Sequence, residues 1–319
     1  MPQYRFVQLD VFTDRAFCGN PLAVFPEAEG ISDEEQSKIA REMNLSETVF
    51  VLPPQSSPAE ESDQKVLRRL RIYTPTREIP FAGHPVVGTW NALAREGVVP
   101  VPEGGSGWTR IFHEVGVGVL PVDIEFKDGQ PVQVVMTQGK FQIQGEIDDS
   151  HEQAEIARAL GLAREDLDES LPIQIISTGL PSLAVPIRAL ADLRQCRVNA
   201  GLLGEIYTRA GATGCLAFTR ETIEIGAARA HSRFFAPADN IPEDPATGSA
   251  GGALGAYLVH HGAAGVEPVD GKFSFVIEQG DFINRPSRIS IEVKGAPGAV
   301  EQVRVGGPSV VVARGEVIF

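Results

Sequence analysis

The sequence predicts an α+β fold in which each of two similar halves curls a sheet around one buried helix. Three observations support this prediction. A helix made of small and apolar residues occurs twice, the segments around it recur in the same order, and most of the remaining chain reads as short strands. Strands and helices do not alternate regularly enough for a doubly wound parallel sheet.

The first buried helix is expected within residues 80–97, which read PFAGHPVVGTWNALAREG. A proline near the start and a glycine just past the end are typical boundaries of a helix. Between them only Arg95 and Glu96 are charged. A helix that is apolar on most faces is buried, and this one is too short to cross a membrane.

Residues 246–262, ATGSAGGALGAYLVHHG, repeat this pattern. Gly83 lies fourteen residues before Gly97, and Gly248 lies fourteen residues before Gly262. The second copy is preceded by three additional residues, Glu-Asp-Pro. These residues either lengthen a loop or add an acidic group beside the helix start.

Two upstream segments recur as well, and all three matches keep their order. The matched segments are 19–24 with 179–185, at an offset of 160–161, and 71–75 with 233–237, at an offset of 162; the helices themselves are 165 residues apart. Two copies at so long a period indicate two similar domains rather than a solenoid.

The remaining elements are predicted from the periodicity of apolar residues and from the residues that commonly begin or end helices and strands. Strands are expected over 4–12, 22–25, 48–52, 66–73, 111–122, 132–138, 173–177, 215–219 and 223–235, with closing strands near 276–277, 289–293, 303–306, 310–313 and 317–319. Surface helices are expected over 33–43, 152–160, 189–194 and 198–209, the first with Ser32 and Glu35 as a capping box. Residues 53–64 read as a polar loop.

Composition excludes several classes of protein. The 319 residues carry a formal net charge of −14 without a Lys/Arg cluster, which argues against nucleic-acid binding. No signal peptide or membrane span is evident, so we expect a cytoplasmic protein without a membrane partner. Three distant cysteines and six histidines without an HExxH motif predict no disulfide framework and no metal site.

The starts of the two buried helices are candidates for binding an anion. The N–H groups of a first helical turn, together with the helix dipole, favour a carboxylate there. Gly83-His84 and Gly248-Ser249 occupy these positions, and two such ends facing each other would make an anion clamp. The alternative is that His84 and Ser249 only cap their helices.

Two carboxylates are candidates for proton transfer. Glu47 lies between a helix and the apolar strand that follows it, and Asp244 lies in the three-residue insertion. A carboxyl group beside apolar surface holds a proton more readily than one in water, as proton transfer near neutral pH requires. The alternative is a solvated Glu47 at a helix end and an Asp244 near a helix cap. The glycine-rich run at 248–255 is not G-x-G-x-x-G, which disfavours a dinucleotide site.

Five motifs together resemble the phenazine-biosynthesis isomerase (PhzF-like) family, and more distantly diaminopimelate epimerase. They are LDVFT at 9–13, FCGNPLAV at 17–24, NLSET at 44–48, PFAGHP at 80–85 and EDPATGSA at 243–250. The resemblance implies a diaminopimelate epimerase-like fold: two pseudo-symmetric domains, each a curled, mostly antiparallel sheet around a central helix. We place the domains at 1–125 plus 303–319 and at 126–302.

The resemblance also implies a site in the cleft between the domains, no cofactor and a homodimer. It assigns Glu47 as the acid/base, with His84 and Asp244 assisting transfer and binding the polar groups of the substrate. The residues expected to bind substrate are Asn20, Gly83, Thr247, Gly248 and Ser249.

The expected function is a cofactor-independent isomerase that moves a proton on a small carboxylate-bearing substrate, similar to trans-2,3-dihydro-3-hydroxyanthranilate isomerase. The epimerase relatives carry paired cysteines where this chain has Ala82 and Thr247, so racemisation by two thiols is disfavoured. An amino-acid racemase or epimerase that uses Glu47 and Asp244, and a binding protein without turnover, are the alternatives.

Overall fold

The computed structural model describes residues 1–55, 65–226 and 228–319. The chain forms two compact units: unit 1 comprises residues 1–137 and 306–319, and unit 2 comprises residues 138–305. The boundaries expected from the sequence, 125/126 and 302/303, fall within strands of the structure, and that division stays a prediction.

Unit 1 is a curled sheet with two helices. Its strands are β1 (Gln3–Val11), β2 (Asn20–Phe25), β3 (Glu47–Leu52), β4 (Val66–Tyr73), β5 (Glu78–Ile79), β6 (Gly107–Val115), β7 (Gly118–Lys127), β8 (Gln130–Thr137) and β18 (Ser309–Ile318). They pair in the order β18-β1-β2-β3-β4-β6-β7-β8, with β5 on β4, and only β2–β3 and β4–β6 are parallel. The helices are α1 (Asp33–Met43) and α2 (Gly83–Arg95).

Unit 2 repeats this plan. Its strands are β9 (Gln142–Ile147), β10 (Ile173–Ser177), β11 (Pro181–Pro186), β12 (Cys215–Thr219), β13 (Ala228–Ala236), β14 (Ile241–Asp244), β15 (Lys272–Gln279), β16 (Ser287–Ala296) and β17 (Ala299–Gly307). The pairing order β9-β10-β11-β12-β13-β15-β16, with β14 on β13, again has two parallel pairs, β11–β12 and β13–β15. Its helices are α3 (Ser150–Ala159), α4 (Leu190–Gln195), α5 (Ala200–Arg209) and α6 (Gly248–His260).

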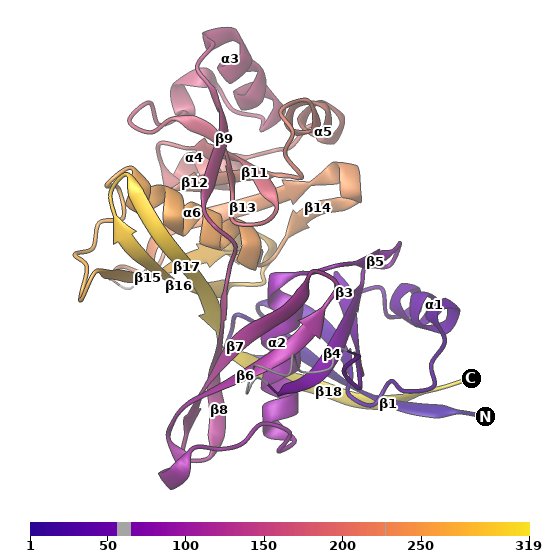
Figure 1. Ribbon diagram of the computed structural model, residues 1–319. Helices are drawn as coiled ribbons and strands as arrows, with labels where there is room; N and C mark the ends of the chain where they lie inside the picture. Colours follow the sequence, from indigo (N-terminus) through magenta and orange to yellow (C-terminus); the bar gives the residue numbers. More distant parts are fainter. Residues whose placement is uncertain (56–64, 227) are drawn as a thin grey trace. The chain divides into compact units, whose positions relative to one another are not determined.

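The two small-residue helices lie at the centres of their units, as the sequence predicts. In Figure 1, strands of unit 1 surround α2 and strands of unit 2 lie against α6. Glycine permits this close approach. A Cβ on Gly88 of α2 would lie 2.6 Å from Leu22, and a Cβ on Gly255 of α6 would lie 2.4 Å from Ile291. Small residues on these faces therefore let each sheet close around its helix.

Several local predictions are confirmed. Helix α1 spans the predicted residues, and Ser32 and Glu35 form the capping box. Strands β4, β10 and β12 have the predicted bounds. Of the loop expected over residues 53–64, positions 56–64 lie outside the described residues.

Three predictions of strand extent are wrong. The closing strands expected near 310–313 and 317–319 are one strand, β18. The single strand expected over 111–122 is two strands, β6 and β7, joined by a turn in which Gly116 packs against Pro80 and Gly118 has a positive φ of 117°. The strand expected over 223–235 begins only at Ala228, because the N–H groups of residues 223 and 224 donate to the buried Glu278 carboxylate instead of to a neighbouring strand.

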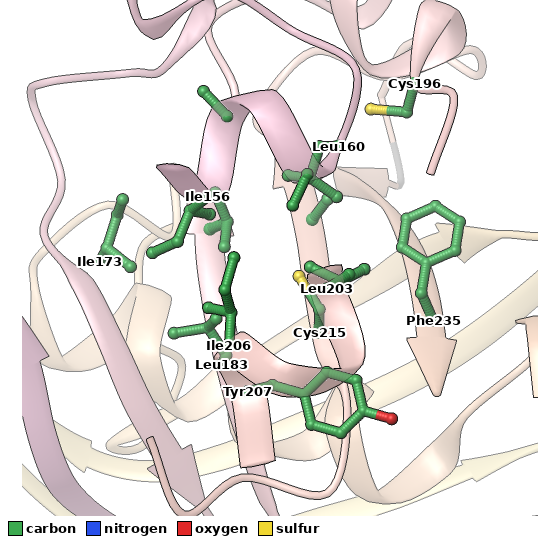
Figure 2. Close-up of a cluster of buried hydrophobic side chains, with 14 of the residues drawn as sticks. Ile156, Leu160, Ile173, Leu183, Cys196, Leu203, Ile206, Tyr207, Cys215 and Phe235 are labelled. Carbon is green, nitrogen blue, oxygen red and sulfur yellow. The ribbon is translucent and has the colours of Figure 1, made fainter. Parts of the chain in front are cut away.

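An apolar cluster fills the part of unit 2 beneath α3 and α5. Figure 2 shows Ile156, Leu203, Tyr207 and Phe235 in it, together with both Cys196 and Cys215. Burial raises the pKa of the Cys196 thiol to about 11 and that of the Cys215 thiol further. These two thiols are core residues and do not supply a nucleophile or a base.

Candidate active site

Glu47 is the first residue of β3, directly opposite Leu22 in the parallel pair with β2. Helix α1 ends at Met43, and the left-handed backbone of its C-cap residue Asn44 (φ 50°) turns the chain toward this strand. The side chain of Glu47 is only 13% exposed. The alternative of a solvated glutamate at a helix end therefore does not describe it.

His84 is the neighbour of Glu47 in unit 1. Its Nε2 lies 3.1 Å from Oε2 of Glu47, and its side chain is 6% exposed. Burial lowers the pKa of His84 to about 3, so the imidazole is neutral at physiological pH. A neutral imidazole carries one N–H and one lone pair, so it can give a proton to a carboxylate at this distance or accept one from it.

The start of α2 presents backbone N–H groups without a side-chain cap. The N-cap residue is Ala82, which makes no side-chain hydrogen bond, and Gly83 and His84 are the first two helical residues. Pro85 follows and has no N–H to satisfy. His84 is thus inside the helix rather than its cap, and the first turn keeps the anion-binding character that the sequence suggests.

Asn20 begins β2 and is fully buried, paired with Val11 in β1. The preceding Gly19 has a φ of 64°, and a Cβ there would lie 2.2 Å from the carbonyl oxygen of Val11. This glycine fixes the direction from which the chain enters β2. Asn20 therefore has a defined position two residues before Leu22, the partner of Glu47.

Asp244 and Thr247 are joined at the start of α6. Asp244 ends β14 and is largely buried, and Thr247 is the N-cap residue of α6. A threonine at an N-cap commonly accepts a hydrogen bond from the first turn. Here the Thr247 hydroxyl donates to Oδ2 of Asp244, and no side-chain cap is formed.

Gly248 and Ser249 are the first helical residues of α6. The carbonyl oxygen of Gly248 accepts a hydrogen bond of 2.9 Å from Nε2 of Gln138, whose Oε1 accepts one of 2.6 Å from Thr178. Ser249, like His84, lies inside its helix and is not its cap.

Two glutamines support the α6 start and were not among the predicted residues. Gln138 is one, and Gln279, the last residue of β15, is the other. Gln279 is fully buried and donates to the backbone oxygen of Asp244 at 2.7 Å. A glutamine at a strand end has no local signature, and only the tertiary structure shows its partners.

The predicted residues thus fall into two groups. Asn20, Glu47, Gly83 and His84 lie in unit 1, and Asp244, Thr247, Gly248 and Ser249 lie in unit 2. Within the described residues no group of three or more His, Cys, Asp or Glu side chains could hold a metal ion. No helix in residues 1–55, 65–226 and 228–319 combines the length and apolar character that a membrane crossing needs.

Comparisons with known proteins match this chain along nearly its whole length. The family model described as phenazine biosynthesis-like protein (PhzC-PhzF) matches residues 9–315. An uncharacterised isomerase of Clostridium acetobutylicum is 36% identical over 99% of both chains. Trans-2,3-dihydro-3-hydroxyanthranilate isomerase of Pseudomonas aeruginosa is 34% identical over 98% of both chains.

A solved structure of a protein of this family has the same fold as this chain. The PhzF-family phenazine biosynthesis protein of Bacillus anthracis matches with a TM-score of 0.83 and 27% identity, over 100% of both chains. The predicted fold class, α+β of the diaminopimelate epimerase type, is confirmed.

Proposed function

The chain belongs to the phenazine biosynthesis-like family and is an isomerase, and on that premise we propose that it moves a proton on a small carboxylate-bearing substrate, with Glu47 as the acid/base. The substrate class follows the name of the Pseudomonas aeruginosa relative, which acts on trans-2,3-dihydro-3-hydroxyanthranilate. That compound is our first candidate substrate.

The observation that carries the proposal is the contact between Glu47 and His84. A general base must sit where it can both take and release a proton. Glu47 is mostly shielded from water and has a neutral imidazole 3.1 Å away, at the uncapped start of α2. The structure therefore supports a carboxylate with a neutral imidazole beside it, next to a turn suited to a substrate carboxylate.

The proposed reaction consists of two proton transfers. Glu47 takes a proton from one carbon of the substrate, and the electron pair of that C–H bond enters the conjugated system. The proton then returns to a different carbon, so the product is an isomer and no oxidant or reductant is consumed. His84 holds the proton-bearing Glu47 in place through its nearby nitrogen.

The α6 start contributes the second part of the proposal. Asp244, Thr247, Gly248 and Ser249 are proposed to bind polar groups of the substrate. If Asp244 only orients the substrate, Asp244→Asn costs less activity than Glu47→Gln. An equal loss indicates that the two carboxylates act as a unit.

The amino-acid epimerase alternative lacks a thiol pair. Ala82 and Thr247 occupy the positions before the helix glycines, and Cys196 and Cys215 are core residues of unit 2. An epimerase here would need Glu47 and Asp244 as its two bases. Incubation with amino acids in deuterated water separates the two reactions, since only an epimerase exchanges an α-hydrogen.

Turnover of trans-2,3-dihydro-3-hydroxyanthranilate by purified enzyme tests the proposal. The wild type should consume it, and Glu47→Gln should bind it but turn over at least ~10³-fold more slowly. Glu42→Gln, at an exposed position in α1, is the matched control and should behave as wild type. An active Glu47→Gln enzyme would remove Glu47 from its proposed role. Cofactor independence, a homodimer and a cytoplasmic location stay predictions.

A further inference from the structure

The amide of Gln279 has only one orientation compatible with its partners. A backbone carbonyl can only accept and a backbone N–H can only donate. Gln279 meets one of each: the carbonyl oxygen of Asp244 lies 2.7 Å from Nε2, and the N–H of Thr247 lies 3.2 Å from Oε1. These two contacts assign the nitrogen and the oxygen of the side chain.

The second hydrogen of that nitrogen points at a hydroxyl. Nε2 of Gln279 also lies 3.0 Å from Oγ1 of Thr247. Because Nε2 has no lone pair to offer, the Thr247 oxygen must accept in this contact. Its single proton is then directed elsewhere, and the structure places Oδ2 of Asp244 at a short hydrogen-bond distance from it.

We propose that Gln279 is a positioning residue of the active site, whose amide aims the hydroxyl proton of Thr247 at Asp244 and so holds Asp244 as a carboxylate. An acceptor oxygen that already receives an O–H proton is a poor place to bind a second one. Asp244 therefore acts as an acceptor toward the substrate and not as the proton donor. The effect on turnover rests on the proposed function, whereas the proton orientation does not.

The chain of hydrogen bonds from Gln279 through Thr247 to Asp244 lies in a region that largely excludes water. Gln279 is fully buried, and Asp244 retains 8% of its accessible surface. Hydrogen bonds are electrostatically stronger in such surroundings, and a chain of them orients its members cooperatively. Removing one donor is accordingly expected to alter the protonation of the carboxylate at the end of the chain.

Charged groups on the elements around Asp244 are mutually paired. Arg233 on β13 contacts Glu243 on β14 at 2.6 Å. His231 on β13 contacts Glu278 on β15 at 2.9 Å. Beside the end of β15, Arg288 contacts Asp281 at 3.0 Å. Arg285 follows Asp281 along the chain. None of these groups is changed by substitution at Thr247, so they form a constant background for the test.

The direct test is a ¹³C NMR titration of the Asp244 carboxyl group, assigned with Asp244→Asn. Thr247→Val keeps the shape of the side chain and removes the hydroxyl, and it should raise the pKa of Asp244 by about 1, a tenfold change in proton affinity. Thr247→Ser keeps the hydroxyl and should restore the wild-type titration. Gln279→Met should shift the titration in the same direction as Thr247→Val.

Thr89→Val is the control for replacing a buried threonine. Thr89 lies in α2, is fully buried, and makes no hydrogen bond through its hydroxyl to the described part of the chain. Its substitution should leave the Asp244 titration unchanged. If Gln279→Met does not fold, the Thr247 pair still tests whether the hydroxyl proton holds Asp244 as a carboxylate. In a folded Gln279→Met, an unchanged Asp244 titration would remove Gln279 from its proposed role.

Identical titrations of Asp244 in the wild type and in Thr247→Val would overturn the proposal. The pH profile of turnover gives a second readout. In Thr247→Val the acid limb of kcat/KM should move to higher pH, and in Thr247→Ser it should not. A wild type that does not turn over the substrate contradicts the proposed function alone, because the NMR titration needs no substrate.

Discussion

The starts of α2 and α6 share one backbone plan and carry different side chains. Each helix begins with a glycine after an N-cap residue that makes no side-chain cap. At α2 the side chains in contact are a carboxylate and a neutral imidazole, Glu47 and His84. At α6 they are a carboxylate, a hydroxyl and an amide, Asp244, Thr247 and Gln279. The first group can exchange a proton, and the second fixes one in place.

An ion pair that precedes α2 in unit 1 has a counterpart before α6 in unit 2. Arg71 contacts Glu78 and lies over the Tyr73 ring in unit 1, and Arg233 contacts Glu243 and lies over the Phe235 ring in unit 2. The supporting pair is therefore kept in both halves. The scaffold is thus repeated, whereas the residues at the two helix starts differ in chemistry.

Of the substitutions that distinguish the two helix starts, replacing His84 should have the largest effect, and the effect should be on kcat. His84→Gln removes the imidazole beside Glu47 and should lower kcat by about 10²-fold, the low end for an acid–base group. His113→Gln is the control, because His113 is equally buried but contacts Trp90 in the core of unit 1. Steady-state kinetics of both variants decide the matter. Equal losses in the two would contradict a specific role for His84.

The shared packing of the helices can be broken at matched glycines. Gly88→Ala places a Cβ 2.6 Å from Leu22, and Gly255→Ala places one 2.4 Å from Ile291, so each should destabilise its unit by about 2 kcal/mol. Urea unfolding measures both.

A third glycine is the control for these substitutions. A Cβ added to Gly201 of α5 would have its nearest atom, on the Asn199 side chain, at 3.8 Å, which is an ordinary van der Waals contact. Gly201→Ala should therefore be neutral or stabilise by up to about 1 kcal/mol. Wild-type stability in Gly88→Ala would show that α2 does not pack closely on β2.

The structural features that could be predicted from the sequence differ between the starts of α2 and α6. The buried helices, the capping box of α1 and the positions of Glu47 and His84 follow from local patterns. The turn at residues 116–117 does not, because residues 115–122 contain no polar side chain that would mark a turn. The partners of Gln279 could not be predicted either, since they lie in one segment, residues 244–247, that is 32 to 35 residues away in the sequence, and no local pattern marks such an amide.

The acid stability of unit 1 should depend on its buried histidines. Burial lowers the pKa of His84 and of His113 to about 3, whereas in the unfolded chain both titrate near 6.5. Below pH 6.5 protons therefore bind preferentially to the unfolded chain, and each histidine should lower the free energy of unfolding by about 1.4 kcal/mol per pH unit until pH 3 is approached.

Fluorescence isolates this effect. Both tryptophans, Trp90 and Trp108, belong to unit 1, so their emission reports its unfolding. Urea titrations between pH 7 and pH 4 should show the slope, and His113→Gln should reduce it by the contribution of one histidine. A slope unchanged in that variant would mean that His113 does not bind a proton on unfolding.

Proton exchange at a substrate carbon tests the role of Glu47 most directly. Wild-type enzyme, Glu47→Gln and Glu42→Gln are incubated with trans-2,3-dihydro-3-hydroxyanthranilate in deuterated water and followed by NMR. Deuterium should enter the ring carbon with wild type and Glu42→Gln and should fail to enter with Glu47→Gln. Deuterium entering at the wild-type rate in Glu47→Gln would contradict the assignment of Glu47 as the group that moves the proton.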